Sequence, residues 1–453
     1  MNKVLIVSHH FPPDAEIGAI RPFELAKYLP SYGWVPIILT VQEKYYLTID
    51  PERNLEDLNM TIHRTNKLPT FNQMFKSIKK VLIGKKRLYS TSRMPTIGLP
   101  GNADHNGQRE TGMQRLRRYY NSLIFFLPDL DHGWIIKGVL AGLSEIRRYN
   151  IDAILATSPP HSAQLIGLIL SFLSGKALIA DFRDPWGLDL LPERYRCKLS
   201  VSIGQMLERL VVRRARAVVS VTPEMTERLA ALYPDYSSKF VTISNGFDAL
   251  EVAMHRNTEK RNGFVITYTG SLYFGRDPFI FFQAISELIR DGNLERDFLE
   301  IRFIGNCRFC DGKSVEAMAT DLGLKDVVTF VDSIPRSEAL KEMAKSHVGL
   351  VLAPQQPLQI PGKVFDLIGM KASILCISEH GATKRLMEKY PLARTVDPND
   401  LTGMKDAILQ LYRQRTEEGG VLDGDFPYEL YERRHIAKRM TTILGARDLM
   451  NKI

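Results

Sequence analysis

The amino-acid sequence predicts an α/β protein made of two Rossmann-like, doubly wound domains, each built on a parallel sheet. The chain has 453 residues, which is too long for one ordinary hydrophobic core and comfortable for two. Short apolar stretches alternate with helical stretches twice over along the chain. These apolar stretches are continuous and rich in β-branched residues, as is typical of parallel strands buried on both faces.

Each half of the chain carries its own series of expected strands. Those of the first half are Val4–Ser8, Val35–Thr40, Ile62–Thr65, Ala153–Ser158, Ala177–Phe182, Ala217–Val221 and Val241–Ser244. Those of the second half are Val265–Thr269, Ile301–Ile304, Val327–Val331, Val348–Ala353, Ile374–Ile377 and Arg394–Val396. Helical apolar spacing is clearest in Arg21–Leu29, Ser162–Leu173, Pro278–Ile289 and Lys363–Met370.

This pattern predicts where the domains begin and end. We expect a first domain over residues 1–250 and a second over 262–427. The polar stretch Ala249–Asn262 is the expected border. The remaining segment, 428–453, is expected to form a helix that crosses back to the first domain. Two such domains facing each other would form an interdomain cleft at the carboxyl ends of both sheets, where ligands of such sheets bind.

No part of the sequence predicts export or a membrane span. The apolar run Val4–Val7 is too short for a signal peptide and fits a first strand. The most apolar stretch, Leu165–Leu173, is far shorter than the roughly 18 residues of a membrane span. We therefore expect a cytoplasmic protein. The lone C-x-x-C of Cys307 and Cys310 favours two reduced thiols over a zinc or redox site.

The net charge of +9 comes from one stretch of the chain. Between Phe71 and Tyr120 there are eleven Lys and Arg residues against two acidic residues, so this stretch accounts for the whole excess. An insert at about 70–112, rich in Lys, Ser, Gly and Asn, interrupts the α/β alternation. The basic and aromatic segment 71–127 fits an anionic surface at the inner face of the plasma membrane, and the alternative is a solvated loop beside a buried helix. It matches no nucleic-acid recognition module, so no nucleic-acid partner is expected.

Three loops of the first half contain candidate site residues. After the first strand, two prolines and Gly18 form a stiff turn, which predicts a close backbone approach to a ligand at Gly18 or a plain strand-to-helix connection. His161 stands near a helix start, where the helix dipole favours a neutral imidazole that bonds a hydroxyl; the alternative is a capping turn. In the third loop, Asp181, Arg183 and Asp184 place charges at the end of a buried strand, which is costly unless they pair or function.

Two loops of the second half predict a diphosphate site. Gly270 and Ser271 turn the chain off a strand, and Arg276 precedes a helix whose N-terminus favours phosphate. The second loop leads into the helix start formed by Gly362, Lys363 and Val364, with Asp366 one turn further on, which suits phosphates at the turn and a ribose diol on the carboxylate. The sequence has neither GxxxxGK[ST] nor GxGxxG, which argues against a nucleotide hydrolase P-loop and a nicotinamide enzyme. It also lacks a DxD cluster in a suitable context, so no metal is expected.

Together these loops resemble the retaining glycosyltransferases of family 4, which have the GT-B fold. The resemblance covers nearly the whole chain and rests on the first loop, on Asn245-Gly246 and on the two loops of the second half. Its most specific part is TSPPHSA (157–163) followed by ADFRDPW (180–186), which resembles a bacterial subgroup that builds cell-surface polysaccharides.

The resemblance implies that the first domain binds the acceptor and the second the nucleotide-sugar donor, and it implies roles for several residues. Arg276 aligns with the basic residue that holds the donor phosphates, and Asp366 with the acid that binds the donor ribose. Leu358 stands where the family has the first acid of an E-x7-E pair, so that pair is broken, and Gln355, Gln356 or Gln359 could replace it.

The implied activity is transfer of a hexose, with retention, from a nucleotide diphosphate sugar to a saccharide or lipid-linked acceptor, without a cofactor. Arg276 and Lys363 would neutralise the departing diphosphate, while Asp184 or His161 would orient the acceptor hydroxyl. Two alternatives stay open. One is a sugar-nucleotide epimerase of the same fold, and the other is a catalytically inactive partner protein.

Overall fold

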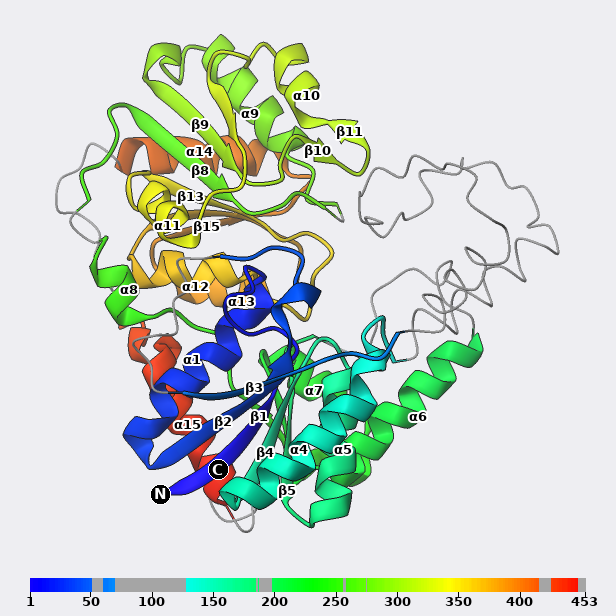
Figure 1. Cartoon of the computed structure of the whole chain (residues 1–453). Coiled ribbons are helices and arrows are strands. Elements are labelled where there is room, and N and C mark those ends of the chain that lie inside the picture. Colours follow the sequence, from blue (N-terminus) through cyan, green and yellow to red (C-terminus); the bar gives the residue numbers. More distant parts are fainter. Residues whose placement is uncertain are drawn as a thin grey trace, which may run out of the picture. The chain divides into compact units, whose positions relative to one another are not determined.

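The computed structural model describes residues 1–50, 60–69, 128–184, 186, 198–255, 258–273, 275–414 and 425–446. The chain forms two compact units (Figure 1). The first consists of Met1–Ser220, Leu229–Val241 and Thr441–Ile453, and the second of Val221–Arg228 and Thr242–Met440. The insert expected at about 70–112 and the wider segment 71–127 lie outside the described residues.

The first unit contains a seven-stranded sheet in the order β3-β2-β1-β4-β5-β6-β7. Neighbouring strands from β3 through β6 pair in parallel. All six residues of β4 are buried, which agrees with its continuous apolar sequence. The strands are β1 Asn2–Val7, β2 Trp34–Val41, β3 Thr61–Thr65, β4 Ala153–Ser158, β5 Ala177–Phe182, β6 Ala217–Ser220 and β7 Phe240–Thr242.

The helices of the first unit include three that lie side by side, α4 Ile135–Tyr149, α5 Ser162–Ser174 and α6 Lys198–Arg214 (Figure 1). α4 packs closely on α5 because its inner side carries glycines. A Cβ on Gly142 would lie 2.5 Å from Leu170 Cδ1. The other helices are α1 Ile20–Tyr28, the helix α7 Pro223–Leu232, which continues into this unit, and the end of α15 Arg433–Gly445.

The second unit contains a six-stranded parallel sheet in the order β12-β9-β8-β13-β14-β15. Its strands are β8 Phe264–Thr269, β9 Leu299–Ile304, β12 Val328–Val331, β13 Val348–Leu352, β14 Ser373–Ile377 and β15 Ala393–Val396. A short antiparallel hairpin of β10 Phe309–Cys310 and β11 Lys313–Ser314 was not expected from the sequence. The helices are α8 Ala249–Ala253, α9 Phe279–Arg290, α10 Val315–Asp321, α11 Arg336–Ala344, α12 Gly362–Gly369, α13 Ala382–Lys389 and α14 Leu401–Gln414.

Both sheets share one topology, which confirms the predicted fold class of two doubly wound parallel sheets. In each, the strand that comes first in the chain lies beside the fourth, and the order reverses between them. We call this place the switch point. It lies between β1 and β4 in the first unit and between β8 and β13 in the second, and ligands of open α/β sheets bind at the carboxyl ends of the strands there. Each expected strand agrees with an observed one to within two residues.

The polar stretch 249–262, expected as the domain border, belongs to the second unit. It begins with α8, which the Asp248 side chain caps by accepting hydrogen bonds from the amides of Leu250 and Glu251. Further on, Lys260 Nζ donates to the carbonyl of Ser346 at 2.6 Å. Lys260 of this stretch therefore has a partner in the second unit. None of the helices in the described ranges has the length and apolar character that crossing a bilayer demands.

Candidate functional site

The switch point of the second unit is formed by the loop after β8, residues 270–278, and the loop after β13, residues 353–361. Gly270 turns the chain off β8 with a φ of 112°, a conformation that favours glycine. Its amide donates to the carbonyl of Ile304 at 2.8 Å, and its own carbonyl accepts from Cys307 Sγ at 3.0 Å. The beginning of the loop is therefore fixed by neighbouring backbone and by a thiol.

Lys363 lies in the first turn of α12, and its ammonium group faces this loop. Nζ lies 3.3 Å from the centroid of the Tyr268 ring and 3.8 Å from where a Cβ on Gly270 would stand. This Nζ atom is buried and donates no hydrogen bond to any of the described residues. Burial lowers the pKa of Lys363 well below its ordinary value, and the charge of Arg276 lowers it further. A buried ammonium without an acceptor is costly, so this arrangement favours a ligand that supplies negative charge.

Arg276 comes from the opposite loop and is buried as well. Its guanidinium donates to Gln356 Oε1 at 3.0 Å and to the Ser271 carbonyl at 3.4 Å, and lies 4.2 Å from the centroid of the Tyr273 ring. Its Nε has no hydrogen-bond partner in the described part of the chain. Neither Arg276 nor Lys363 forms an ion pair with any carboxylate that the structure describes. Two basic side chains thus meet at this switch point without an ion-pair partner in the described part of the chain.

The N-terminus of α12 adds backbone donors. Pro361 is the N-cap and offers no side-chain hydrogen bond. The amides of Gly362 and Lys363 stand in the first turn, where no intrahelical acceptor exists, and the helix dipole favours an anion there. The Val364 amide already donates to the Pro361 carbonyl at 3.0 Å, and its side chain is buried. The Val364 amide is therefore less available to a ligand than the amides of Gly362 and Lys363.

Asp366, the predicted ribose ligand, is buried and already has a cationic partner. Its two carboxylate oxygens accept hydrogen bonds from Arg336 at 2.8 and 3.2 Å. Arg336 also donates to both oxygens of Glu251 at 3.1 Å. Burial opposes the charge of Arg336, but the two carboxylates outweigh it and raise its pKa. A carboxylate can accept about four hydrogen bonds, so ribose would share Asp366 with Arg336. The sequence did not indicate Arg336.

At the switch point of the first unit, the loop charges are neutralised. Arg21 Nε lies 3.2 and 3.0 Å from the two oxygens of Asp181, and a second guanidinium nitrogen donates at 2.8 Å. Thr157 Oγ1 also donates to Asp181, at 2.8 Å. Asp181 is fully buried. The charges at the end of β5 therefore include a structural ion pair.

Arg183 is buried and binds backbone carbonyls. It donates to the carbonyls of Ser158 at 3.1 Å, Pro159 at 2.5 Å and Gly18. A Cβ on Gly18 would lie 3.0 Å from this guanidinium and 3.3 Å from the His10 ring. In the structure, the backbone at Gly18 closely approaches two side chains of the protein itself, those of Arg183 and His10. Asp184, the next residue after Arg183, is half-buried.

His161 stacks on Trp186, with ring centroids 4.6 Å apart and planes 3° apart. Trp186 is 1% exposed and is therefore part of the core of the first unit. The start of α5 is capped by Asp129, which accepts from the amide and the hydroxyl of Ser162, both at 2.6 Å. Burial, together with the charge of Asp131, raises the pKa of Asp129 to about 6.

Two further pairs at this edge were missed by the sequence reasoning. His10 Nδ1 lies 2.7 Å from Asp14 Oδ2, and Asp14 Oδ1 accepts from the Glu16 amide at 3.1 Å. Asp131 accepts from Lys67 at 2.7 Å, and His9 Nε2 lies 3.2 Å from the same oxygen. The consecutive histidines after the first strand were the available signal. The partner of His10 lies four residues further on in the same loop, whereas the partner of His9 lies on a distant segment that spacing does not indicate.

The structure resembles solved structures over nearly its whole length, although no protein-family model matches the sequence and a search of curated protein sequences finds no match. One is Alr3699/HepE of Anabaena in complex with UDP, with a TM-score of 0.60, 13% identity, and coverage of 98% of this chain and 100% of that one. Another is sucrose-phosphate synthase of Thermosynechococcus elongatus, with a TM-score of 0.56, 14% identity and 98% of each chain covered. A putative UDP-N-acetylglucosamine 2-epimerase of Listeria monocytogenes has a TM-score of 0.53 at 12% identity, with 97% of this chain and 94% of that one covered.

The chain has the GT-B fold.

Within this GT-B fold the two buried thiols of the C-x-x-C have separate surroundings. Cys307 donates to Gly270 as described, while Cys310 Sγ lies 4.0 Å from Asp311 Oδ2. Burial raises the pKa of each thiol to about 12, so both are protonated at neutral pH. In the described residues, no three His, Cys, Asp or Glu side chains lie together in a way that could hold a metal ion.

Proposed function

We propose that the protein is a glycosyltransferase that moves a sugar from a nucleotide diphosphate sugar to a saccharide acceptor. The observation that carries this proposal is the pair of buried cations at the second switch point, Lys363 and Arg276, which no described carboxylate balances. A diphosphate supplies the missing charge and accepts hydrogen bonds from both side chains and from the amides at the start of α12. Gly270 and Ser271 complete the loop beside it.

The chemistry follows from where charge develops. The bond between the anomeric carbon and the diphosphate oxygen breaks, and the diphosphate leaves with the electron pair. Arg276 and Lys363 stabilise that growing negative charge, which is the electrostatic part of catalysis. The acceptor hydroxyl forms the new bond, oriented by Asp184 or His161 of the first unit, and its proton passes to the leaving phosphate or to solvent.

Finer features of the proposal come from the family 4 resemblance. They are a hexose as the transferred sugar, retention of the anomeric configuration, a lipid-linked acceptor, a role in bacterial surface polysaccharide biosynthesis, and ribose binding by Asp366. No metal or other cofactor takes part. The cytoplasmic protein would reach its acceptor at the inner membrane face, with segment 71–127 against anionic lipid. Solved structures of the same fold support a nucleotide-sugar donor, since HepE is described in complex with UDP-glucose, at a TM-score of 0.58 and 13% identity.

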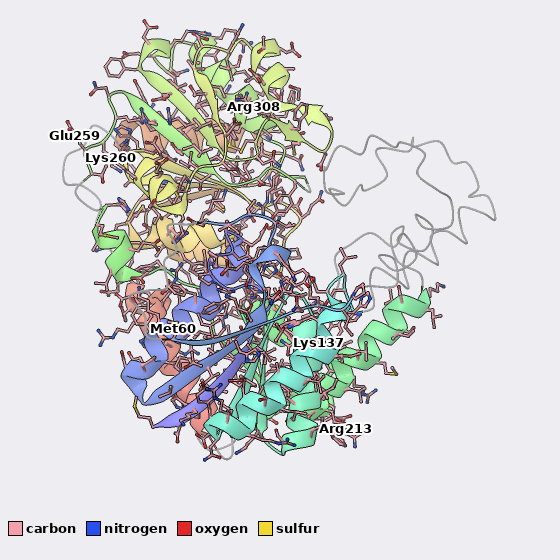
Figure 2. All side chains as sticks on the ribbon, viewed as in Figure 1. Met60, Lys137, Arg213, Glu259, Lys260 and Arg308 are labelled. Carbon is pink, nitrogen blue, oxygen red and sulfur yellow. The ribbon has the colours of Figure 1, made fainter. Side chains whose placement is uncertain are left out.

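The experiment begins with calorimetric titration of uridine, guanosine and adenosine diphosphates and of their sugars, which identifies the donor. Arg276→Ala should then lower turnover by about 100-fold or more, as for loss of a donor that stabilises a transition-state oxyanion, and the protein should remain folded. Arg308→Ala is the matched control, because Arg308 is an exposed arginine of the same unit, paired with Glu316 at 3.2 Å (Figure 2). Full activity of Arg276→Ala would contradict the proposal.

An epimerase is the second candidate, because the Listeria structure with this fold is described as a putative 2-epimerase. Incubation with the donor alone distinguishes the two, since epimerisation needs no acceptor, whereas transfer does. An inactive partner protein would release no nucleoside diphosphate under either condition.

A further inference from the structure

The helices α4 and α6 of the first unit have an unusual distribution of residues between their two sides. Of the five buried positions of α6, Ser200, Gly204 and Glu208 are small or polar, and only Val211 and Val212 are apolar. Its large apolar residues Leu199 and Met206 are 51% and 54% exposed, and Leu210 is 43% exposed. These three positions are seven and four residues apart, so they form one row along the helix. An ordinary amphipathic helix of a globular protein places such a row against the core.

The helix α4 repeats this distribution. Its buried positions include Gly138 and Gly142, which allow the close contact with α5, whereas Ile136 and Leu140 are 58% and 61% exposed. At the end of α5, Phe172 is 77% exposed and Leu173 57%. Since α4 and α6 both contact α5, the exposed residues of these helices form the surface of one helix layer. We call it the α4–α6 face.

The charges of the α4–α6 face all have one sign. The three helices contain two acidic residues, and both are buried and engaged: Glu145 lies 2.9 Å from His63 Nδ1, and Glu208 accepts from the Tyr233 hydroxyl at 2.6 Å. Six basic side chains are exposed, namely Lys137, Arg147, Arg148, Lys198, Arg209 and Arg213. Figure 2 labels Lys137 on α4 and Arg213 near the end of α6, so the positive charges extend over the layer.

We infer that the α4–α6 face docks the protein on an anionic lipid bilayer. Exposed leucine, isoleucine, methionine and phenylalanine can enter the boundary between headgroups and acyl chains, while the surrounding lysines and arginines meet anionic headgroups. A protein partner or a solvated surface would not need an apolar row together with complete absence of exposed acidic residues on the three helices. The inference goes beyond the proposed function and rests on α4, α5 and α6 alone, not on segment 71–127.

The test is co-sedimentation of the full chain with phosphatidylcholine vesicles, with and without phosphatidylglycerol. The protein should bind the anionic vesicles and lose binding as salt rises. Each basic residue near the surface strengthens binding about fivefold, so the double variant Arg209→Glu with Arg213→Glu should bind at least about 25-fold more weakly. Met206→Glu with Leu210→Glu should also reduce binding by at least tenfold, or about 1.4 kcal/mol.

Matched controls separate this face from other causes. Lys313 and Met254 of the second unit are exposed, and Lys313→Glu with Met254→Glu should leave vesicle binding unchanged. Tryptophan fluorescence and nucleotide binding establish that each variant is folded.

Three results would overturn the inference. One is absence of binding to anionic vesicles by the unaltered protein. Another is that the double variant Lys79→Glu with Lys80→Glu loses vesicle binding, while the variants of the α4–α6 face keep it. The third is a concentration-dependent dimer that Met206→Glu with Leu210→Glu abolishes, because the face would then join two copies of the chain.

Discussion

The two switch points have the same strand order but differ in their electrostatics. In the first unit, cations lie against carboxylates, as Arg21 does against Asp181 and Lys67 against Asp131. In the second unit, neither Lys363 nor Arg276 forms an ion pair with a carboxylate among the described residues, and one nitrogen of each has no hydrogen-bond partner there. Topology alone therefore does not determine what a doubly wound sheet binds. The neutralised edge suits an uncharged ligand rich in hydroxyls, and the edge with two unbalanced cations suits an anion.

The largest effect should come from breaking a neutralised pair. Asp181→Asn leaves the buried guanidinium of Arg21 without its charge partner, and this should lower the free energy of unfolding of the first unit by about 3–5 kcal/mol. All three tryptophans, Trp34, Trp134 and Trp186, lie in that unit. Their fluorescence during urea unfolding therefore measures the first unit selectively.

The corresponding change in the second unit should have the opposite sign. Lys363→Met keeps the length and apolar part of the side chain and removes a buried charge without a partner. We expect stability to rise by about 1 kcal/mol and nucleoside diphosphate binding to weaken at least tenfold. Circular dichroism follows both units, and the tryptophan signal identifies the contribution of the first. A loss of stability in Lys363→Met comparable to that in Asp181→Asn would remove the contrast between the two edges.

The pH dependence of binding should sharpen the same comparison. The lowered pKa of Lys363 means that the free protein loses this proton as pH rises, whereas a bound diphosphate favours the charged form. Above about pH 7, where phosphates are fully ionised, affinity should therefore fall with pH by up to about tenfold per unit, or 1.4 kcal/mol. Calorimetry in buffers of different ionisation enthalpy should detect proton uptake on binding. In Lys363→Met, the affinity should not fall with pH in this way, and binding should take up no proton.

The free energy of unfolding should depend on pH through Lys363 in the opposite direction to the binding affinity. Between the lowered folded-state pKa and the ordinary lysine value, the unfolded chain binds more protons than the folded chain. The contribution of Lys363 to the free energy of unfolding therefore rises with pH through that window and reaches its maximum above it. A fall in this window that Lys363→Met abolishes would contradict the assigned direction of the shift.

The sequence predicted the strands well because parallel strands buried on both faces are continuous apolar runs, and β4 and β5 begin and end where expected. It also indicated both basic residues of the second switch point, since Arg276 lies just before a helix and Lys363 in the first turn of one. The hairpin β10–β11 was missed because two-residue strands leave no periodic signal.

Interactions between distant segments were beyond the sequence. Nothing near Asp366 in the chain indicates Arg336, which is 30 residues away, or Glu251 beyond it. Similarly, the apolar spacing of α6 gives no sign that its leucines face outward, because that depends on which side packs on the sheet. A single sequence provides periodicity, whereas the direction of a face is determined by tertiary packing.

The smallest predicted effect concerns Asp366, whose carboxylate has two candidate partners. If it binds the donor ribose as well as Arg336, the protein should prefer a nucleoside diphosphate over its 2′,3′-dideoxy analogue by about tenfold, or 1.4 kcal/mol, and Asp366→Asn should reduce that preference to about twofold. Glu251→Gln is the matched control, since it removes the other carboxylate of Arg336 and should lower stability similarly while the preference stays intact. A preference unaffected by Asp366→Asn would leave the ion pair with Arg336 as its sole role. The second edge would then recognise the diphosphate through its two unbalanced cations, and selection of the ribose would have to come from residues other than Asp366.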